Sequence, residues 1–234
     1  VYLQQSFKRY YPEAEVTAHV VGFTNVDDHG QEGLELAYND WLTGKPGKTL
    51  VIKDRIGRSI STIRSLAEQQ PGHDLVLSIN RRIQYIAYRE LMAGVKNNLA
   101  ESASVIVVDV KTGEILAMVN QPSFNPNKRT AKEASAFRNR AITDTFEPGS
   151  TIKAFSVASA FDSGKYQPET VIDTYPGWLR LGRNPVPVRD EHNLGKVTVT
   201  QILQLSSNVG AKKMILSLPP NQLWTMLHKV GFGE

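Results

Sequence analysis

The apolar segment at residues 152–161 constrains the fold of this chain more than any other feature. It follows the pair Pro148-Gly149 and ends at Asp162-Ser163-Gly164, which are start and stop signals of a helix. Its residues are apolar or small on nearly every side, and such a helix is stable only when other elements cover most of its surface. The sequence therefore predicts a helix that is buried on most sides.

Two reactive side chains stand at the start of this helix, with Ser150 three residues before Lys153. Side chains three residues apart share one face of a helix, so the amine can reach the hydroxyl. A serine in the first turn also lies near unpaired backbone N–H groups and the positive end of the helix dipole, which favour an oxyanion. The spacing indicates a nucleophile with its base. The alternative is a capping serine and a lysine that extends to solvent.

The role of Lys153 as a base requires a large change in its pKa. A lysine pKa must fall from about 10.4 to about 7 or 8, which corresponds to roughly 4 kcal/mol. A helix terminus supplies only about 0.3–1 kcal/mol at an exposed site. Burial must therefore supply most of the change, and the apolar neighbours of Lys153 are compatible with that.

A second polar group, the tripeptide Ser206-Ser207-Asn208, lies between two apolar segments that are typical of helices. Such a hinge can direct a hydroxyl and an amide into one cleft. Ser206 is the candidate for passing a proton between Lys153 and a leaving group, and Asn208 for orienting Lys153 and holding a substrate amide. Taken alone, the tripeptide also fits a cap between helices.

The two motifs together point to a known family. S-x-x-K, S-D-N and K-T-G are established motifs of penicillin-binding proteins and class A β-lactamases. Ser207 stands where the S-D-N pattern has Asp, which favours a penicillin-binding protein. The chain resembles the class B penicillin-binding proteins, and among them the division-specific peptidoglycan D,D-transpeptidases. The resemblance is carried by Val21-Gly22-Phe23-Thr24-Asn25, Glu32-Gly33-Leu34-Glu35, Lys53-Asp54-Arg55, Gly113-Glu114-Ile115-Leu116-Ala117-Met118, Arg138-Asn139-Arg140-Ala141 and Phe146-Glu147-Pro148-Gly149-Ser150-Thr151-Ile152-Lys153.

The resemblance implies an α+β fold, the penicillin-recognising serine transferase fold, in which helices cluster on a mainly antiparallel sheet. Residues 1–70 would be the C-terminal part of a non-catalytic pedestal domain. Residues 71–234 would be the N-terminal part of the transpeptidase domain.

The resemblance also implies an activity. Ser150 would attack the D-Ala-D-Ala bond of a peptidoglycan stem peptide during septal cell-wall synthesis, and an amine of a second stem would resolve the acyl-enzyme. β-Lactams would acylate the same serine. Catalytic roles fall to Ser150, Lys153, Ser206 and Asn208. Expected partners are stem peptides, β-lactams and division-complex membrane proteins, including a lipid-linked glycan polymerase.

The family's third motif, a Lys-Thr/Ser-Gly on a strand downstream of residue 208, is not found. Lys111-Thr112-Gly113 has the right letters but lies between the apolar runs 105–108 and 115–119, which predict a β-hairpin around it. The chain ends at Glu234 before any strand that would carry the true motif. We therefore expect these residues alone to form an incomplete cleft with little or no turnover.

Other segments give local expectations. Residues 33–42 predict a helix within a charged, turn-rich region, and residues 74–79 alternate like a strand. Asn80 is a suitable cap for a helix with its apolar face on residues 83–95. The Pro- and Gly-rich segment at residues 175–193 favours a charged surface loop.

Composition excludes several other functions. The 27 basic and 23 acidic residues give a net charge of +4, with no basic stripe for nucleic acid. Cysteine is absent, and the five histidines lack metal-ligand spacing, so we expect no metal and no cofactor. No apolar stretch is long enough to span a bilayer. The resemblance implies a bacterial periplasmic protein held to the inner membrane by a helix upstream of Val1.

Three alternatives to a transpeptidase differ in class. A β-lactamase or a β-lactam sensor domain would share the first two motifs, but the pedestal-like residues 1–70 count against both. A catalytically silent division scaffold would not need an intact Ser150, Lys153, Ser206 and Asn208. A Gly-x-Ser-x-Gly hydrolase is excluded because Ile152 occupies the place of the second glycine.

Overall fold

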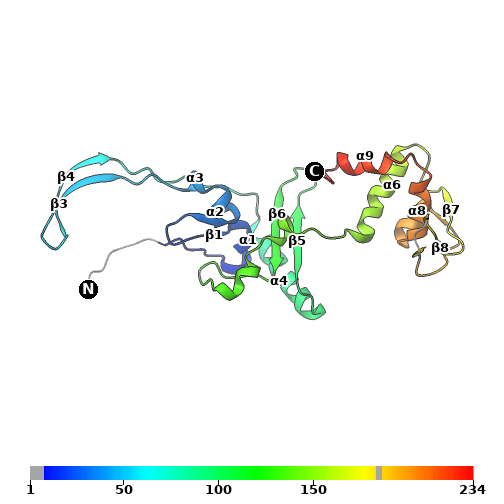
Figure 1. Ribbon diagram of the computed structural model, residues 1–234, viewed down its shortest axis with the longest axis horizontal. Coiled ribbons are helices and arrows are strands. Elements are labelled where there is room, and N and C mark those ends of the chain that lie inside the picture. The colour runs from blue at the N-terminus through cyan, green and yellow to red at the C-terminus, as the bar shows by residue number, and fades with distance from the viewer. Residues whose placement is uncertain (1–7, 183–185, 234) are drawn as a thin grey trace. The chain divides into compact units, whose positions relative to one another are not determined.

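The computed structural model describes residues 8–182 and 186–233. The chain divides into two compact units, residues 1–145 and 146–234, each of which is described by itself (Figure 1). In the part of the chain that the structure describes, no helix has both the length and the apolar character needed to cross a membrane.

Among its described residues, the first unit combines helices with three antiparallel strand pairs, β1–β2, β3–β4 and β5–β6. Its strands are β1 (Phe23–Thr24), β2 (Gly30–Glu32), β3 (Lys48–Lys53), β4 (Ser59–Ala67), β5 (Ala103–Val108) and β6 (Ile115–Gln121). Its helices are η1 (Ala14–Val16), α1 (Ala18–Val21), α2 (Gly33–Ala37), α3 (Asn39–Leu42), α4 (Arg81–Asn98), η2 (Ala131–Ala136) and α5 (Arg140–Thr143). A cluster of buried side chains holds its N-terminal part together, namely Tyr11, Ala18, Phe23, Phe124 and Ala136.

Helix α4 and the hairpin β5–β6 form as expected, but the apolar face of α4 is only partly covered, and the buried residue of this helix is Gln84. The side chain of Asn80 accepts hydrogen bonds from the backbone N–H groups of Arg82 and Ile83 and caps the helix. Lys111-Thr112-Gly113 lies in the hairpin turn, where Asp109 Oδ1 accepts from the N–H of Lys111 at 2.8 Å. This turn is held by its own local hydrogen bonds, so the resemblance of its letters to the family motif is coincidental.

Two local expectations for this unit were incomplete or wrong, and one hairpin had no expectation. The predicted helix at residues 33–42 is broken at Tyr38 into α2 and α3. Residues 74–79 form no strand, because only isolated bonds tie this stretch to β6, such as that from Ser78 Oγ to the carbonyl of Ile115 at 2.8 Å. The hairpin β3–β4 was missed, because three register shifts interrupt the alternation that would reveal it.

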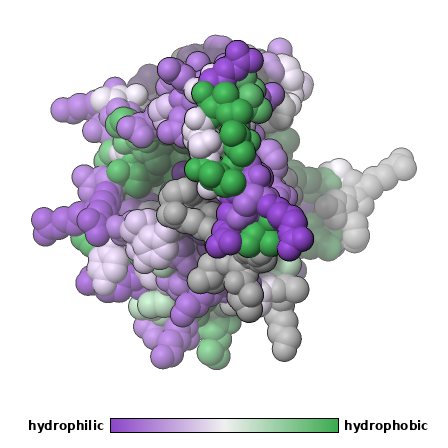
Figure 2. All heavy atoms as spheres, turned by 90° about the vertical axis from the view of Figure 1, so that its left-hand side faces the viewer, coloured by the Kyte–Doolittle hydropathy of each residue, from purple (hydrophilic) through white to green (hydrophobic). Residues whose placement is uncertain are grey.

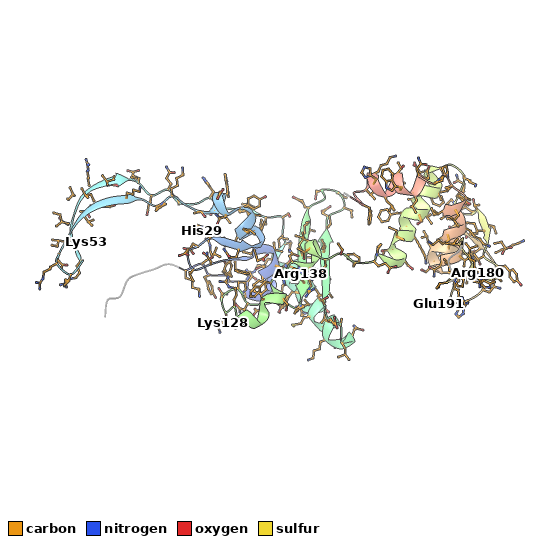
Figure 3. The ribbon with its side chains drawn as sticks, in the orientation of Figure 1. His29, Lys53, Lys128, Arg138, Arg180 and Glu191 are labelled. Carbon is orange, nitrogen blue, oxygen red and sulfur yellow. The ribbon has the colours of Figure 1, made fainter. Side chains whose placement is uncertain are left out.

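The hairpin β3–β4 exposes an unusual number of aliphatic side chains. Its large apolar residues with more than 40% exposure are Leu50, Ile52, Ile56, Ile60, Ile63 and Leu66. Figure 2, viewed from the hairpin side, shows apolar side chains beside strongly hydrophilic ones. Lys53, at the end of β3, is one of the basic residues near the tip of the hairpin (Figure 3).

The second unit packs helices with short strand pairs. Its helices are η3 (Gly149–Thr151), α6 (Ile152–Asp162), α7 (Val199–Gln204), α8 (Asn208–Leu216) and α9 (Gln222–Lys229). Strand β7 (Val171–Asp173) pairs with β10 (Lys196–Thr198), and β8 (Trp178–Leu179) pairs with β9 (Val188–Arg189), all antiparallel. The helix predicted after Ser150 and the two around residues 206–208 are confirmed.

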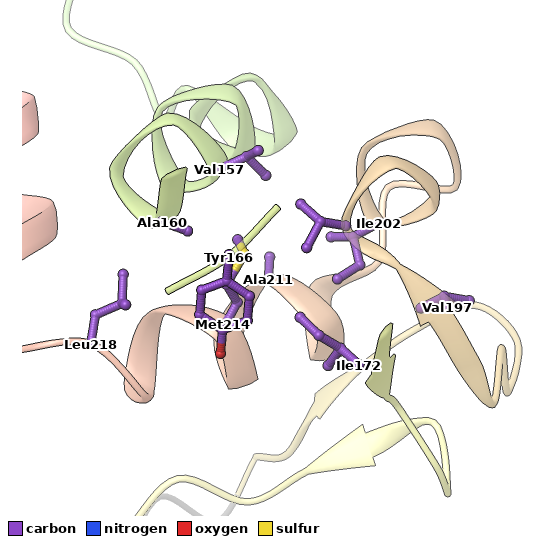
Figure 4. Close-up of a cluster of buried hydrophobic side chains, with 10 residues drawn as sticks. Val157, Ala160, Tyr166, Ile172, Val197, Ile202, Ala211, Met214 and Leu218 are labelled. Atoms are coloured by element: carbon purple, nitrogen blue, oxygen red, sulfur yellow. The ribbon is translucent and has the colours of Figure 1, made fainter. Parts of the chain in front are cut away.

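One hydrophobic core joins α6, α7 and α8 (Figure 4). It contains Val157 and Ala160 of α6, Ile202 of α7 and Met214 of α8, with Tyr166 and others between them. Gly210 allows the close approach of α7 and α8, because a Cβ at this position would lie 2.7 Å from the side chain of Ile202. The core therefore fixes the start of α6 relative to the α7–α8 connection.

Helix α6 is less enclosed than its sequence predicts. Lys153, Ser156, Val157, Ser159 and Ala160 are buried. Ala154, Ala158 and Phe161 are exposed, and their spacing of four and three residues places them on one stripe of the helix. The α7–α8 side covers the opposite face, so the expectation of burial on most sides was too strong.

Candidate active site

The hydroxyl of Ser150 and the amine of Lys153 lie in direct contact. Lys153 Nζ donates a hydrogen bond to Ser150 Oγ at 3.1 Å. Ser150 stands in the 3-10 turn η3 that leads into α6, after Gly149 at φ +58°. No side-chain cap bond begins α6, so the hydroxyl of Ser150 is bound to Lys153 and not used as a helix cap. The geometry supports the pairing that the three-residue spacing predicted.

Ser206 completes a triangle with these two residues. Its Oγ donates to Ser150 Oγ at 2.9 Å and accepts from Lys153 Nζ at 2.9 Å, and its backbone carbonyl accepts from the same amine at 2.5 Å. Ser206 has φ +53°, a left-handed conformation that costs a non-glycine residue about 1–3 kcal/mol. This backbone conformation accompanies the use of both its hydroxyl and its carbonyl by Lys153. Three polar groups therefore meet at one point.

The candidate nucleophile and the candidate base differ in their exposure to solvent. Ser150 is exposed, whereas Lys153 is only 7% exposed. Loss of hydration disfavours the ammonium form and lowers the pKa of Lys153, and the nearby carboxylate of Asp190 opposes this by raising it. A lowered pKa of Lys153 agrees with a role as a base. A neutral amine can accept the proton of Ser150 Oγ, which a charged one cannot.

Asp190 anchors the start of α8 from a distant loop. Its carboxylate accepts from Ser207 Oγ at 2.8 Å, from the backbone N–H of Asn208 at 2.5 Å and from that of Val209 at 3.0 Å. Ser207 Oγ in turn accepts from the N–H of Gly210 at 2.9 Å. A carboxylate is favoured at a helix N-terminus, where N–H groups lack partners. Asp190 therefore fixes the tripeptide 206–208 against the strand β9.

Asn208 lines the same cleft, but among the described residues no hydrogen bond joins its side chain to Lys153. Its side-chain amide donates to the carbonyl of Arg189 at 2.9 Å. The hydrogen-bond partners found for Lys153 Nζ are Ser150 and Ser206. The suggested role of Asn208 in orienting Lys153 therefore stays a prediction, and Ser206 holds the amine directly.

A cleft of about 540 Å³ opens beside these residues. Ser150, Lys153 and Asn208 line it, together with apolar side chains of β9, α8 and α9. Its size is within the range of small-molecule and peptide sites. Among the residues described, no group of three or more His, Asp or Glu side chains is placed to hold a metal ion.

The sequence did not reveal Asp190. It lies in the segment 175–193, which the composition assigned to a solvated surface loop. Its partners stand 17 to 19 residues further along the chain, and no local spacing connects them. The sequence shows the charged run that contains Asp190, but it does not show which of these charges has a role. The packing of β9 against α8 brings the Asp190 carboxylate to the start of α8.

Comparison with known proteins identifies the family. The profile of the penicillin-binding protein transpeptidase domain matches residues 103–234. The chain belongs to the penicillin-binding protein transpeptidase family. The profile of the penicillin-binding protein dimerisation domain matches residues 1–77.

Relatives of known name share the full length of the chain. It is 45% identical over 234 residues to the peptidoglycan D,D-transpeptidase FtsI of Escherichia coli, covering 100% of this chain and 39% of that protein. It is 40% identical over 232 residues to the probable peptidoglycan D,D-transpeptidase PenA of Neisseria gonorrhoeae, covering 98% of this chain and 39% of the relative. The chain thus spans about two fifths of these penicillin-binding proteins.

The fold is similar to solved penicillin-binding proteins. The crystal structure of penicillin-binding protein 3 from Mycobacterium tuberculosis in complex with aztreonam gives a TM-score of 0.81 at 29% identity, covering 96% of this chain and 46% of that one. The predicted α+β fold of this family is confirmed. The division of the chain at residues 70 and 71, and the catalytic roles of the four site residues, stay predictions.

Asp190→Asn should shift the pH profile of acylation by penicillin toward lower pH. Removal of the carboxylate removes the charge that raises the pKa of Lys153, so the amine becomes neutral at lower pH. The amide keeps only one acceptor for the three donors, so the maximal rate should fall about tenfold. Acylation rates measured between pH 5 and 10 in the full-length protein would test both effects.

Glu191→Gln is the matched control, because Glu191 is the adjacent carboxylate and is exposed (Figure 3). It removes the same charge without touching α8. An equal shift in both variants would show that Asp190 acts only through general surface charge.

Proposed function

We propose that the protein containing this chain is a serine-type peptidoglycan D,D-transpeptidase that β-lactams acylate and inhibit. The hydrogen-bonded triangle of Ser150, Lys153 and Ser206 at the edge of the cleft is the observation that carries this proposal. The family and the names of the relatives support it. So does the complex of a similar protein with aztreonam.

The geometry suggests how acylation proceeds. Neutral Lys153 Nζ takes the proton of Ser150 Oγ as this oxygen attacks the carbonyl carbon of the penultimate D-Ala. Collapse of the tetrahedral intermediate breaks the C–N bond. Ser206 Oγ, which is hydrogen-bonded to Lys153 Nζ and to Ser150 Oγ, passes the proton from Lys153 to the leaving amine of D-Ala. An ester on Ser150 remains. The amine of a second stem peptide then attacks this ester and releases Ser150.

We further propose that the reaction takes place at the division septum, on the periplasmic side of the inner membrane. This location rests on the resemblance of the sequence to the division-specific peptidoglycan D,D-transpeptidases. A lipid-linked glycan polymerase would be the partner that supplies new strands, because cross-linking requires freshly polymerised glycan.

Intact-mass spectrometry of the full-length protein after exposure to benzylpenicillin tests the proposal. We expect a mass increase of one penicillin, located on the peptide that contains Ser150, with slow release of the acyl group. Absence of the adduct, or an adduct on another residue, would contradict it. Rapid release would instead favour a β-lactamase.

Ser206→Ala and Asn208→Ala should each slow acylation without abolishing it. Loss of Ser206 Oγ removes the proton relay but leaves the Ser150–Lys153 contact, and we expect a decrease of about 100-fold, the lower end for general acid–base groups. Loss of the Asn208 amide should have a smaller effect on the chemical step and a larger one on substrate binding. Stopped-flow acylation rates measured over a range of substrate concentrations would separate the effect on the chemical step from the effect on binding. Equal rates for wild type and Ser206→Ala would exclude the relay.

A further inference from the structure

Helix α8 presents a cation to the cleft, Lys212, that has no partner among the described residues. Asn208, Ala211, Lys212 and Ile215 all line the cleft, and their spacing of three and four residues places them on one face of the helix. Lys212 is exposed and stands one turn after Asn208. In the described ranges, no hydrogen bond or ion pair engages its ammonium group.

The neighbouring lysine has a different environment. Lys213 Nζ donates to the carbonyl of Asp173 at 2.7 Å and to that of Tyr175 at 3.4 Å. Its charge is therefore used to tie α8 to the end of β7. Two adjacent lysines thus have distinct positions, one structural and one directed at the cleft.

The other charged groups of the cleft lining do not neutralise Lys212. The amine of Lys153 is held by Ser150 and Ser206. Glu147 also lines the cleft and is exposed, but no ion pair joins it to Lys212 in the part of the chain that is described. A positive charge with no partner among the described residues, in a cleft that contains Ser150, favours an anionic group on the ligand.

We propose that Lys212 binds a carboxylate of the stem peptide that occupies the cleft, an inference that rests on the transpeptidase function proposed above. Lys212 lies four residues after Asn208, about 6 Å along the helix axis. The carboxylate therefore belongs to an internal residue of the peptide and not to the bond that Ser150 breaks. Both the acyl donor and the acceptor stem can carry such a group.

The test uses the full-length protein and pairs of synthetic peptides. Each donor ends in D-Ala-D-Ala and each acceptor carries a free side-chain amine, and both are made with the internal carboxylate either free or converted to the amide. We expect Lys212→Met to raise KM about tenfold for the free-carboxylate peptide, as for a charge-assisted contact, and to leave KM for its amide unchanged. Lys212→Arg should restore most of the affinity. If KM rises only for the donor peptides, the carboxylate that Lys212 binds is on the donor stem. If KM rises only for the acceptor peptides, that carboxylate is on the acceptor stem.

Lys213→Met is the matched control, since it removes the same charge one residue away and outside the cleft. A similar rise of KM in both variants, or an equal effect of Lys212→Met on free and amidated peptides, would overturn the proposal. The proposed function fails separately, if the wild-type protein forms no penicillin adduct on Ser150.

Discussion

Ser150→Ala should abolish covalent labelling by penicillin while the fold remains intact. The variant loses the only atom that forms the ester in the proposed reaction. Its structural cost should be about 1 kcal/mol, the net value of a typical hydrogen bond. Lys153 keeps both acceptors on Ser206, so the buried amine is not left without partners. Intact-mass spectrometry measures the adduct, and thermal unfolding measures the stability.

Ser163→Ala serves as the control for this substitution. Ser163 follows the same helix at its far end, where its Oγ donates to the carbonyl of Ala160 at 2.6 Å. The Ser163→Ala protein should lose about as much stability as Ser150→Ala, but penicillin should still label it fully. Labelling of the Ser150→Ala protein at the wild-type level would show that another residue is the nucleophile.

Lys153→Arg should reduce the rate of acylation by about 10²–10⁴-fold, the usual contribution of a general base. The guanidinium keeps the charge and hydrogen-bond donors but is not deprotonated in proteins, so it cannot accept the proton of Ser150. In the wild type, burial lowers the pKa of Lys153, so acylation should rise with pH through a value below that of an ordinary lysine. The arginine variant should lack this rise. Rates measured across pH test both points.

Lys165→Arg is the corresponding control, because Lys165 donates to the carbonyl of Ser217 at the surface, outside the cleft. Its rate and pH profile should match the wild type. If Lys153→Arg reacts as fast as this control, Lys153 is not the base.

The separate packing of two adjacent lysines illustrates the limit of sequence reasoning. Nothing in the local pattern distinguishes Lys212 from Lys213 as a ligand-binding or a structural residue. Their roles depend on which face of α8 meets the core through Val209 and Met214. Likewise, the exposed stripe of α6 was not foreseen, because the apolar pattern gives no information about which neighbours are present.

The sequence by itself predicted the pairing of Ser150 with Lys153, the helices that carry the motifs, and the resemblance to the family. These features are local, because residues three apart in a helix are neighbours in any fold that keeps the helix. Only the tertiary structure decided that Ser206, 53 residues beyond Lys153, supplies two acceptors to its amine, and that Asp190 fixes α8. Such contacts are set by the packing of the core around Ile202 and Met214, and no periodicity of the chain encodes them.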